Sequence, residues 1–92
     1  MNTTMQVTDV KVFPIKNSQT KIRAFAQLVL NNSFRVTGLR IIEGDNGLFI
    51  GYPSEKSKEG KYYEIIKPLN RNGIDIIQDS VLREYEHAVS AA

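Results

Sequence analysis

The spacing of apolar residues changes once along this chain of 92 residues, and the change separates a strand-forming part from a helix-forming part. Up to residue 70, short segments alternate apolar and polar side chains, as half-buried β-strands do. Beyond residue 70, apolar residues recur every three or four positions, which is the period of an amphipathic α-helix. These residues are Ile74, Ile77, Val81, Tyr85 and Ala88. The pattern predicts an α+β fold, an antiparallel β-sheet with one C-terminal α-helix packed on it.

We expect four to five strands, separated by residues that favour turns. The clearest strand ends at Asn31-Asn32, a pair typical of a two-residue hairpin because asparagine tolerates positive φ angles. In the next strand the alternation shifts at Gly38, which indicates a β-bulge or a bend. Asn46-Gly47 is the strongest signal for the turn that follows. The expected strands span residues 6–13, 21–30, 34–42, 48–52 and, as a short fifth strand, 61–66, with a polar loop over 54–60.

The helix is expected over residues 72–89. Asn72 is placed to cap its N-terminus, because an asparagine side chain can accept a hydrogen bond from a free backbone N–H there. Asp75 is expected in the first turn, where a negative charge interacts favourably with the helix dipole. Residues 72–92 carry four acidic residues and one basic residue, so this part of the chain is acidic.

Length and composition restrict the class of protein. A chain of this length predicts one domain, 1–92, since compact domains usually run from roughly 50 to 200 residues. The chain has no cysteine, which excludes a disulfide framework and fits a reducing compartment. It has neither a signal-peptide pattern at its start nor an apolar run near the about 20 residues of a spanning helix. We therefore expect a cytoplasmic protein with no membrane partner.

Few residues offer catalytic or metal-binding chemistry. His87 is the only histidine, so a histidine-based triad or a multi-histidine metal site within one subunit is excluded. Glu43 and Asp45 lack the alternating acidic loop of calcium sites, and Asp75 and Asp79 are spaced as on a solvated helix face. We expect no enzymatic activity, no metal, no cofactor and no small-molecule substrate.

Charge is distributed unevenly, although the net charge is only +2. Residues 56–71 contain five basic and two acidic residues, and Tyr62 and Tyr63 lie among them. Lysines attract phosphates by releasing counterions, and aromatic rings stack on unpaired bases. This favours nucleic-acid binding, but the two tyrosines are equally explained as one core and one surface residue of a strand.

An ordered set of motifs resembles the SpoVG family, the stage V sporulation protein G or septation regulators. The motifs are MQVTDV at 5–10, LRIIEGDNGLFI at 39–50, Pro53-Ser54, Gly60, Pro68-Leu69-Asn70 and IQDSVL at 77–82. The resemblance covers residues 5–86 and implies that residues 1–4 are an N-terminal extension. It also implies a homodimer, with sheet pairing across the dimer, that binds DNA and/or RNA and regulates gene expression in septation or sporulation.

In this family the basic segment after Pro53-Ser54 is associated with nucleic-acid binding. Lys56 matches a basic family position, and Lys67 stands where the family often has histidine. The sequence departs from the family at Glu55, where lysine is usual, and at Tyr63, where arginine is usual. The resemblance therefore implies retained phosphate affinity and leaves any family sequence preference in doubt, since lysine offers only a point charge in place of a planar arginine fork.

These observations define one candidate nucleic-acid site. Its cations are expected to contact phosphates, and one of its tyrosines to stack on a base. The site consists of Lys56, Lys58, Lys61, Lys67, Arg71, Tyr62 and Tyr63. Lys21, Arg23 and Arg35 extend it if the polar face of the sheet adjoins it. The alternative is a protein–protein interaction module that uses a sheet edge and the helix face.

Overall fold

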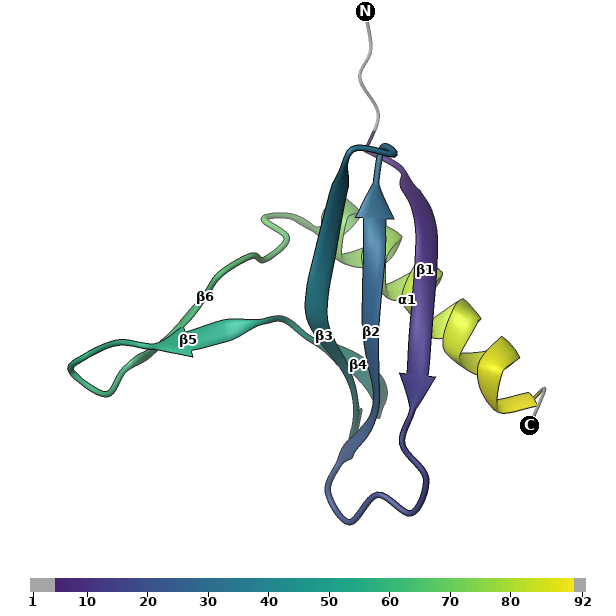
Figure 1. Cartoon of the computed structure of the whole chain (residues 1–92), viewed down its shortest axis with the longest axis horizontal. Coiled ribbons are helices and arrows are strands. Elements are labelled where there is room, and N and C mark those ends of the chain that lie inside the picture. Colours follow the sequence, from purple (N-terminus) through teal and green to yellow (C-terminus); the bar gives the residue numbers. More distant parts are fainter. Residues whose placement is uncertain (1–4, 91–92) are drawn as a thin grey trace, which may run out of the picture.

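The computed structural model describes residues 5–90, so the extension proposed for residues 1–4 lies outside the described residues. Strands β1 to β4 form one antiparallel sheet in that order, and β5 and β6 form a separate antiparallel hairpin. Figure 1 shows α1 along one face of the four-stranded sheet, while the hairpin projects away from it. The elements are β1 (Val7–Pro14), β2 (Ile22–Leu30), β3 (Phe34–Gly44), β4 (Gly47–Gly51), β5 (Ser54–Lys56), β6 (Tyr62–Glu64) and α1 (Arg71–Ser90). This arrangement confirms the predicted α+β fold.

The hydrophobic core lies between the sheet and α1. It is built from alternate residues of the three strands β2, β3 and β4 and from two helix residues one turn apart. Burying a leucine or isoleucine side chain contributes about 1.5–3 kcal/mol relative to leaving it in water, so this face holds the helix in place. The buried residues are Ala24, Ala26, Leu28, Leu39, Ile41, Ile50, Ile77 and Val81.

Of the two alternatives predicted at Gly38, a β-bulge or a bend, the structure has the β-bulge. Ala26 pairs with Leu39 and Leu28 pairs with Val36, so β3 has one residue more than β2 between these pairs. Gly38 has a φ of 81°, and a Cβ atom there would lie 3.3 Å from the Cβ of Pro53. The bulge explains the shifted alternation, because it lets Val36 and Leu39 both face the core.

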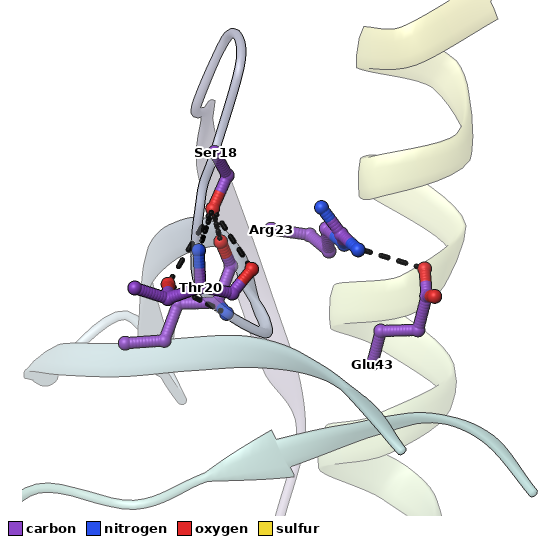
Figure 2. A network of polar contacts seen from close by, with 5 residues as sticks. Ser18, Thr20, Arg23 and Glu43 are labelled. Carbon is purple, nitrogen blue, oxygen red and sulfur yellow. Dashed lines mark hydrogen bonds and ion pairs between the residues drawn. The ribbon is translucent and has the colours of Figure 1, made fainter. Parts of the chain in front are cut away.

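A second bulge, at Arg23, was not predicted, and it changes which face two residues occupy. Ile22 pairs with Ile42 and Ala24 pairs with Ile41, so the extra residue is on β2. Ile22 therefore lies on the face opposite Ala24, although strict alternation along residues 21–30 predicts both on the buried face. Arg23 Nε lies 3.3 Å from an oxygen of Glu43, an ion pair drawn in Figure 2.

The loop between β1 and β2 is held by the side chain of Ser18. Its hydroxyl donates a hydrogen bond to the carbonyl oxygen of Ile22, at 2.6 Å. The Oγ atom of Ser18 also accepts a hydrogen bond from the backbone N–H of Thr20, at 3.3 Å (Figure 2). These bonds fix the chain immediately before the bulge at Arg23.

Both predicted turns are present. The connection after Leu30 is one residue longer than the predicted two-residue hairpin, because Leu30 pairs with Phe34 and residues 31–33 lie between them. Asn31 and Asn32 have φ angles of 49° and 53°, and the N–H of Ser33 donates to the carbonyl of Leu30 at 2.8 Å, as a tight hairpin requires. In the second turn, for which Asn46-Gly47 was the strongest signal, residues 45–46 connect Gly44 to its partner Gly47. Of the residues in this second turn, only Gly47 has a positive φ, so the glycine closes the turn instead of occupying its centre.

The N-cap of α1 is Asn70, and the prediction of Asn72 was wrong. The Oδ1 atom of Asn70 accepts a hydrogen bond from the N–H of Gly73 at 2.9 Å, which is the N-cap geometry. The sequence predicted Asp75 within the first turn of the helix. Because the helix begins at Arg71, Asp75 lies beyond that turn. Asp75 instead forms an ion pair with Arg71, at 3.4 Å between Nε and Oδ1.

Candidate nucleic-acid interface

The basic segment is a β-hairpin instead of a loop followed by a strand. Residues 54–56, expected in a loop, form β5 and pair with β6. The N–H of Ser57 donates to the carbonyl of Lys61 at 2.7 Å, and the N–H of Gly60 donates to the carbonyl of Ser57 at 3.0 Å. Backbone pairing with β6 thus orders residues 54–56, although their polar side chains do not predict a strand.

Two side-chain pairs cross this hairpin. Lys56 stands opposite Tyr62, with its Nζ atom 5.9 Å from the centre of the tyrosine ring. Glu55 stands opposite Tyr63, and the tyrosine hydroxyl donates a hydrogen bond to Glu55 Oε2 at 3.0 Å. This bond and the negative charge of Glu55 both raise the pKa of Tyr63. The two positions at which the sequence departs from the SpoVG pattern therefore contact each other.

The hairpin places most of the predicted site residues on one exposed element. Tyr62 is 73% and Tyr63 is 51% exposed, so both tyrosines are surface residues and neither is a core residue. Figure 1 shows the hairpin at one side of the molecule and the C-terminal end of α1 at the other. The hairpin carries Lys56, Lys58, Lys61, Tyr62 and Tyr63.

The last two predicted residues lie nearer the body of the fold. Lys67 follows the hairpin and lines a groove that it shares with Tyr62 and Tyr63. Arg71 does not line this groove; it begins α1, and its guanidinium is paired with Asp75. The structure therefore joins Lys67 to the hairpin surface and separates Arg71 from that groove.

The groove connects the hairpin with the sheet face that α1 leaves uncovered. It has a volume of about 690 Å³. From the sheet it is lined by Arg40 and Phe49, and from the hairpin side by Tyr63, Glu64 and Lys67, among others. Two cations and one carboxylate thus line it, together with aromatic rings.

Sequence reasoning missed the aromatic residues of the open sheet face. Phe13, Phe25 and Phe49 are 53%, 47% and 45% exposed on that face. The available signal was Phe25, which occupies a polar-face position in the alternating segment 21–30. Of the strand cations expected to extend the site, Arg23 forms an ion pair with Glu43. Arg35 stands opposite Val29 in the sheet register, at a position on the open face.

A second groove, on the helix side, is lined mostly by apolar residues. Its volume is about 330 Å³, and Leu28, Val36, Ile66 and Leu69 contribute to its lining. Leu69 is 88% exposed, which is high for a leucine. The connection between β6 and α1 therefore presents apolar surface to the solvent.

Two properties of residues 5–90 bear on other kinds of site. Within this part of the chain, no three side chains of His, Cys, Asp or Glu gather closely enough to hold a metal ion. Of the described residues, no helix is both long and apolar enough to cross a membrane.

Comparison with known proteins gives one consistent result. The family model SpoVG matches residues 5–87. A protein of Caldicellulosiruptor bescii is 41% identical over 87 residues, which cover 95% of this chain and 98% of that protein. A protein of Bacillus cytotoxicus is 41% identical over 88% of this chain and 82% of its own length. One of Bdellovibrio bacteriovorus is 39% identical over 89% of this chain and 74% of its own. All three relatives are provisionally named septation protein SpoVG.

Proposed function

The chain belongs to the SpoVG family, and from this premise we propose that it is a homodimeric, non-enzymatic regulator of gene expression that binds DNA and/or RNA. The observation that carries the proposal is the exposed β5–β6 hairpin. Three lysines and two tyrosines project from one element, and the groove at its base adds Lys67. Lysines at such a surface favour a polyanion, and exposed aromatic rings favour bases over a purely electrostatic ligand.

Two features support the homodimer. Strands β1 and β4 are the edges of the four-stranded sheet, and an edge strand has backbone groups free to pair with a second copy. The apolar groove and the exposed Leu69 offer side-chain contacts that such a copy would bury. Dimerisation would bring two basic hairpins into one assembly and lengthen the surface available to phosphates.

Binding at two salt concentrations tests the proposal. Labelled duplex DNA and single-stranded RNA are titrated with the protein at about 50 and about 200 mM salt, and fluorescence anisotropy is measured. We expect affinity to fall steeply with salt, with log K changing by roughly 0.7–0.9 per log unit of salt for each phosphate neutralised. Reversing the three hairpin lysines, Lys56→Glu, Lys58→Glu and Lys61→Glu, is expected to abolish binding.

A matched control removes the same charge elsewhere. Lys16→Glu and Arg83→Glu, together with Gln19→Glu and Gln78→Glu, make the same total change of charge outside the hairpin and the open sheet face. We expect this variant to retain most of the affinity. Equal loss in the two variants would show that only net charge matters, and unchanged binding in the hairpin variant would refute the site.

The second candidate function is a protein–protein interaction module. The exposed apolar surface around Leu69 favours it, because large apolar side chains in water often mark an interaction site. It predicts no binding to either nucleic acid at low salt and association with a protein partner that depends little on salt.

A further inference from the structure

The open face of the four-stranded sheet carries a row of side chains that the hairpin site does not include. In the sheet register Phe13 stands opposite Phe25, and Phe25 stands opposite Arg40. Side chains directly opposite each other on neighbouring strands lie about 4.5–5.5 Å apart at their Cβ atoms, so these three form one continuous row across β1, β2 and β3. We call this row the Phe13–Phe25–Arg40 ladder.

The ladder is available to a ligand. The helix covers the opposite face, where Ala24 and Ala26 are buried, whereas both phenylalanines of the ladder are about half exposed. Half-exposed phenylalanines leave ring surface in water, which is unfavourable unless something covers it. The open face therefore presents flat apolar rings beside a guanidinium group.

Gly51 makes room for Arg40 at the end of the ladder. Arg40 pairs with Gly51 on β4, and a Cβ atom at Gly51 would lie 3.3 Å from Arg40 Nη2 and 2.7 Å from Ile42 Cδ1. Arg40 Nη2 also donates to the carbonyl oxygen of Tyr52 at 3.4 Å. The guanidinium is thus held against the backbone of β4, at the groove that leads to Tyr63 and Lys67.

We propose that the Phe13–Phe25–Arg40 ladder is a stacking platform for the unpaired bases of a single-stranded nucleic acid, whose phosphates run toward the lysine hairpin. Aromatic and guanidinium planes are the groups on which splayed bases stack, and they tolerate any base because every base has a π-face. Lys11, Arg35 and Arg40 face outward on this side of the sheet. Among the paired positions of β1, β2 and β3 on this face, Asp9 is the only carboxylate. This charge suits a polyanion. The inference rests on the proposed nucleic-acid binding and adds that the bases must be unpaired.

The absence of tryptophan from the chain allows a direct test. Phe25→Trp places one indole on the ladder, and Phe34→Trp places one at an exposed position at the start of β3, outside the ladder. Each variant is titrated with uridine and thymidine oligomers of about 12 nucleotides, and with duplex DNA. We expect single strands to quench the fluorescence of Phe25→Trp and to leave that of Phe34→Trp nearly unchanged.

Truncation gives a second, independent readout. Phe25→Ala is expected to weaken single-strand binding by about 5- to 150-fold, the range for losing one stacked base. Duplex affinity should change much less, because paired bases cannot stack on the ladder. Circular dichroism of each variant confirms that the sheet is intact, and Phe25→Trp keeps the test informative if Phe25→Ala fails to fold.

The outcomes separate this inference from the proposed function. Anisotropy that reports binding of single strands without quenching in Phe25→Trp would overturn the ladder and leave the hairpin site standing. No binding of any oligomer to the unmodified protein at about 50 mM salt would overturn both. A change in oligomeric state of Phe25→Ala, measured by light scattering, would assign this face to a protein interface and overturn the ladder. Quenching by RNA alone or DNA alone would support it and identify the strand bound.

Discussion

The hydroxyl of Tyr63 donates a hydrogen bond to the carboxylate of Glu55 across β5 and β6, with 3.0 Å between the oxygens. By the SpoVG resemblance these positions usually carry arginine and lysine, so two cations that would face each other are replaced by a donor and an acceptor. Like charges directly opposite each other on paired strands are destabilising. The exchange therefore favours the hairpin fold while it removes two positive charges from the proposed nucleic-acid surface.

The first prediction concerns the ionisation of Tyr63. The hydrogen bond to Glu55, and secondly the negative charge of Glu55, raise the pKa of Tyr63 above its ordinary value of 10.0. Because the folded-state pKa is raised, the contribution of Tyr63 to the free energy of unfolding is complete below the unfolded pKa of about 10. That contribution is lost as pH rises through the folded pKa. We expect Glu55→Gln to lower the pH midpoint at which the Tyr63 hydroxyl ionises. NMR of the Tyr63 ring across the alkaline range measures it, and an unchanged midpoint would contradict the hydrogen bond.

The second prediction concerns affinity for nucleic acid. Glu55→Lys replaces a carboxylate on the hairpin with a cation, so we expect tighter binding and a salt slope steeper by roughly 0.7–0.9 for one added phosphate contact. Glu86→Lys makes the same change of charge near the C-terminal end of α1, on an exposed residue. Salt-dependent anisotropy compares the two variants. An equal gain in both would mean that the hairpin is not the contact surface.

Much of the fold could be predicted from the sequence because its main signals are local. The apolar stripe through Ile77 and Val81 repeats within one element, and the bulge at Gly38 shows as a shift within one strand. The positive φ angles of Asn31 and Asn32 likewise follow from the residue type. In each case the residues that decide the structure are neighbours along the chain.

The errors arise where tertiary pairing decides. Residues 54–56 have little strand propensity, yet they form β5 because β6 supplies backbone partners. Asn70 and Asn72 are both suitable caps by type, and only the point at which the helix starts distinguishes them. Strict alternation would also place Ile22 on the face of Ala24, but the bulge at Arg23 puts the two residues on opposite faces.

The candidate site was predicted only in part, because some of its residues are neighbours in sequence and others are brought together only by strand pairing. Most of its hairpin residues are close in sequence, so a charge and aromatic pattern could identify them. Phe13, Phe25 and Arg40 become neighbours only through the register of three strands, which no local pattern specifies. A phenylalanine at a polar-face position was the one sign available in the sequence.

The third prediction tests the start of α1. Asn70→Ala removes the acceptor of the Gly73 N–H, so we expect a loss of about 1 kcal/mol in the free energy of unfolding. Asn72→Ala is the matched control: this residue lies inside the helix, where alanine is the better helix former, and stability should be unchanged or slightly raised. Urea unfolding followed by circular dichroism measures both. The reverse order of effects would restore Asn72 as the cap.

The fourth prediction links the Gly38 bulge to the open face of the sheet. Gly38→Ala puts a Cβ atom at a φ of 81° and 3.3 Å from Pro53 Cβ, so we expect destabilisation by about 1–3 kcal/mol. Gly60→Ala serves as the control, because its φ is similar, 87°, but the nearest atom to the added Cβ is the flexible Lys56 Cε at 3.8 Å. Urea unfolding compares the two variants, and equal losses would mean that backbone strain alone matters and that the Pro53 contact adds nothing.

The same substitution also reports on the ladder. The extra residue at the bulge sets the register in which Arg40 stands opposite Phe25, and a slip by one residue would move Arg40 to the helix face. If Gly38→Ala removes the bulge, we expect the amide signals of β3 from Leu39 to Ile42 to shift together with loss of single-strand binding. If those signals stay in place while stability falls, the bulge persists under strain, and single-strand affinity should be retained. Loss of binding with an unchanged β3 would contradict the role assigned to Arg40.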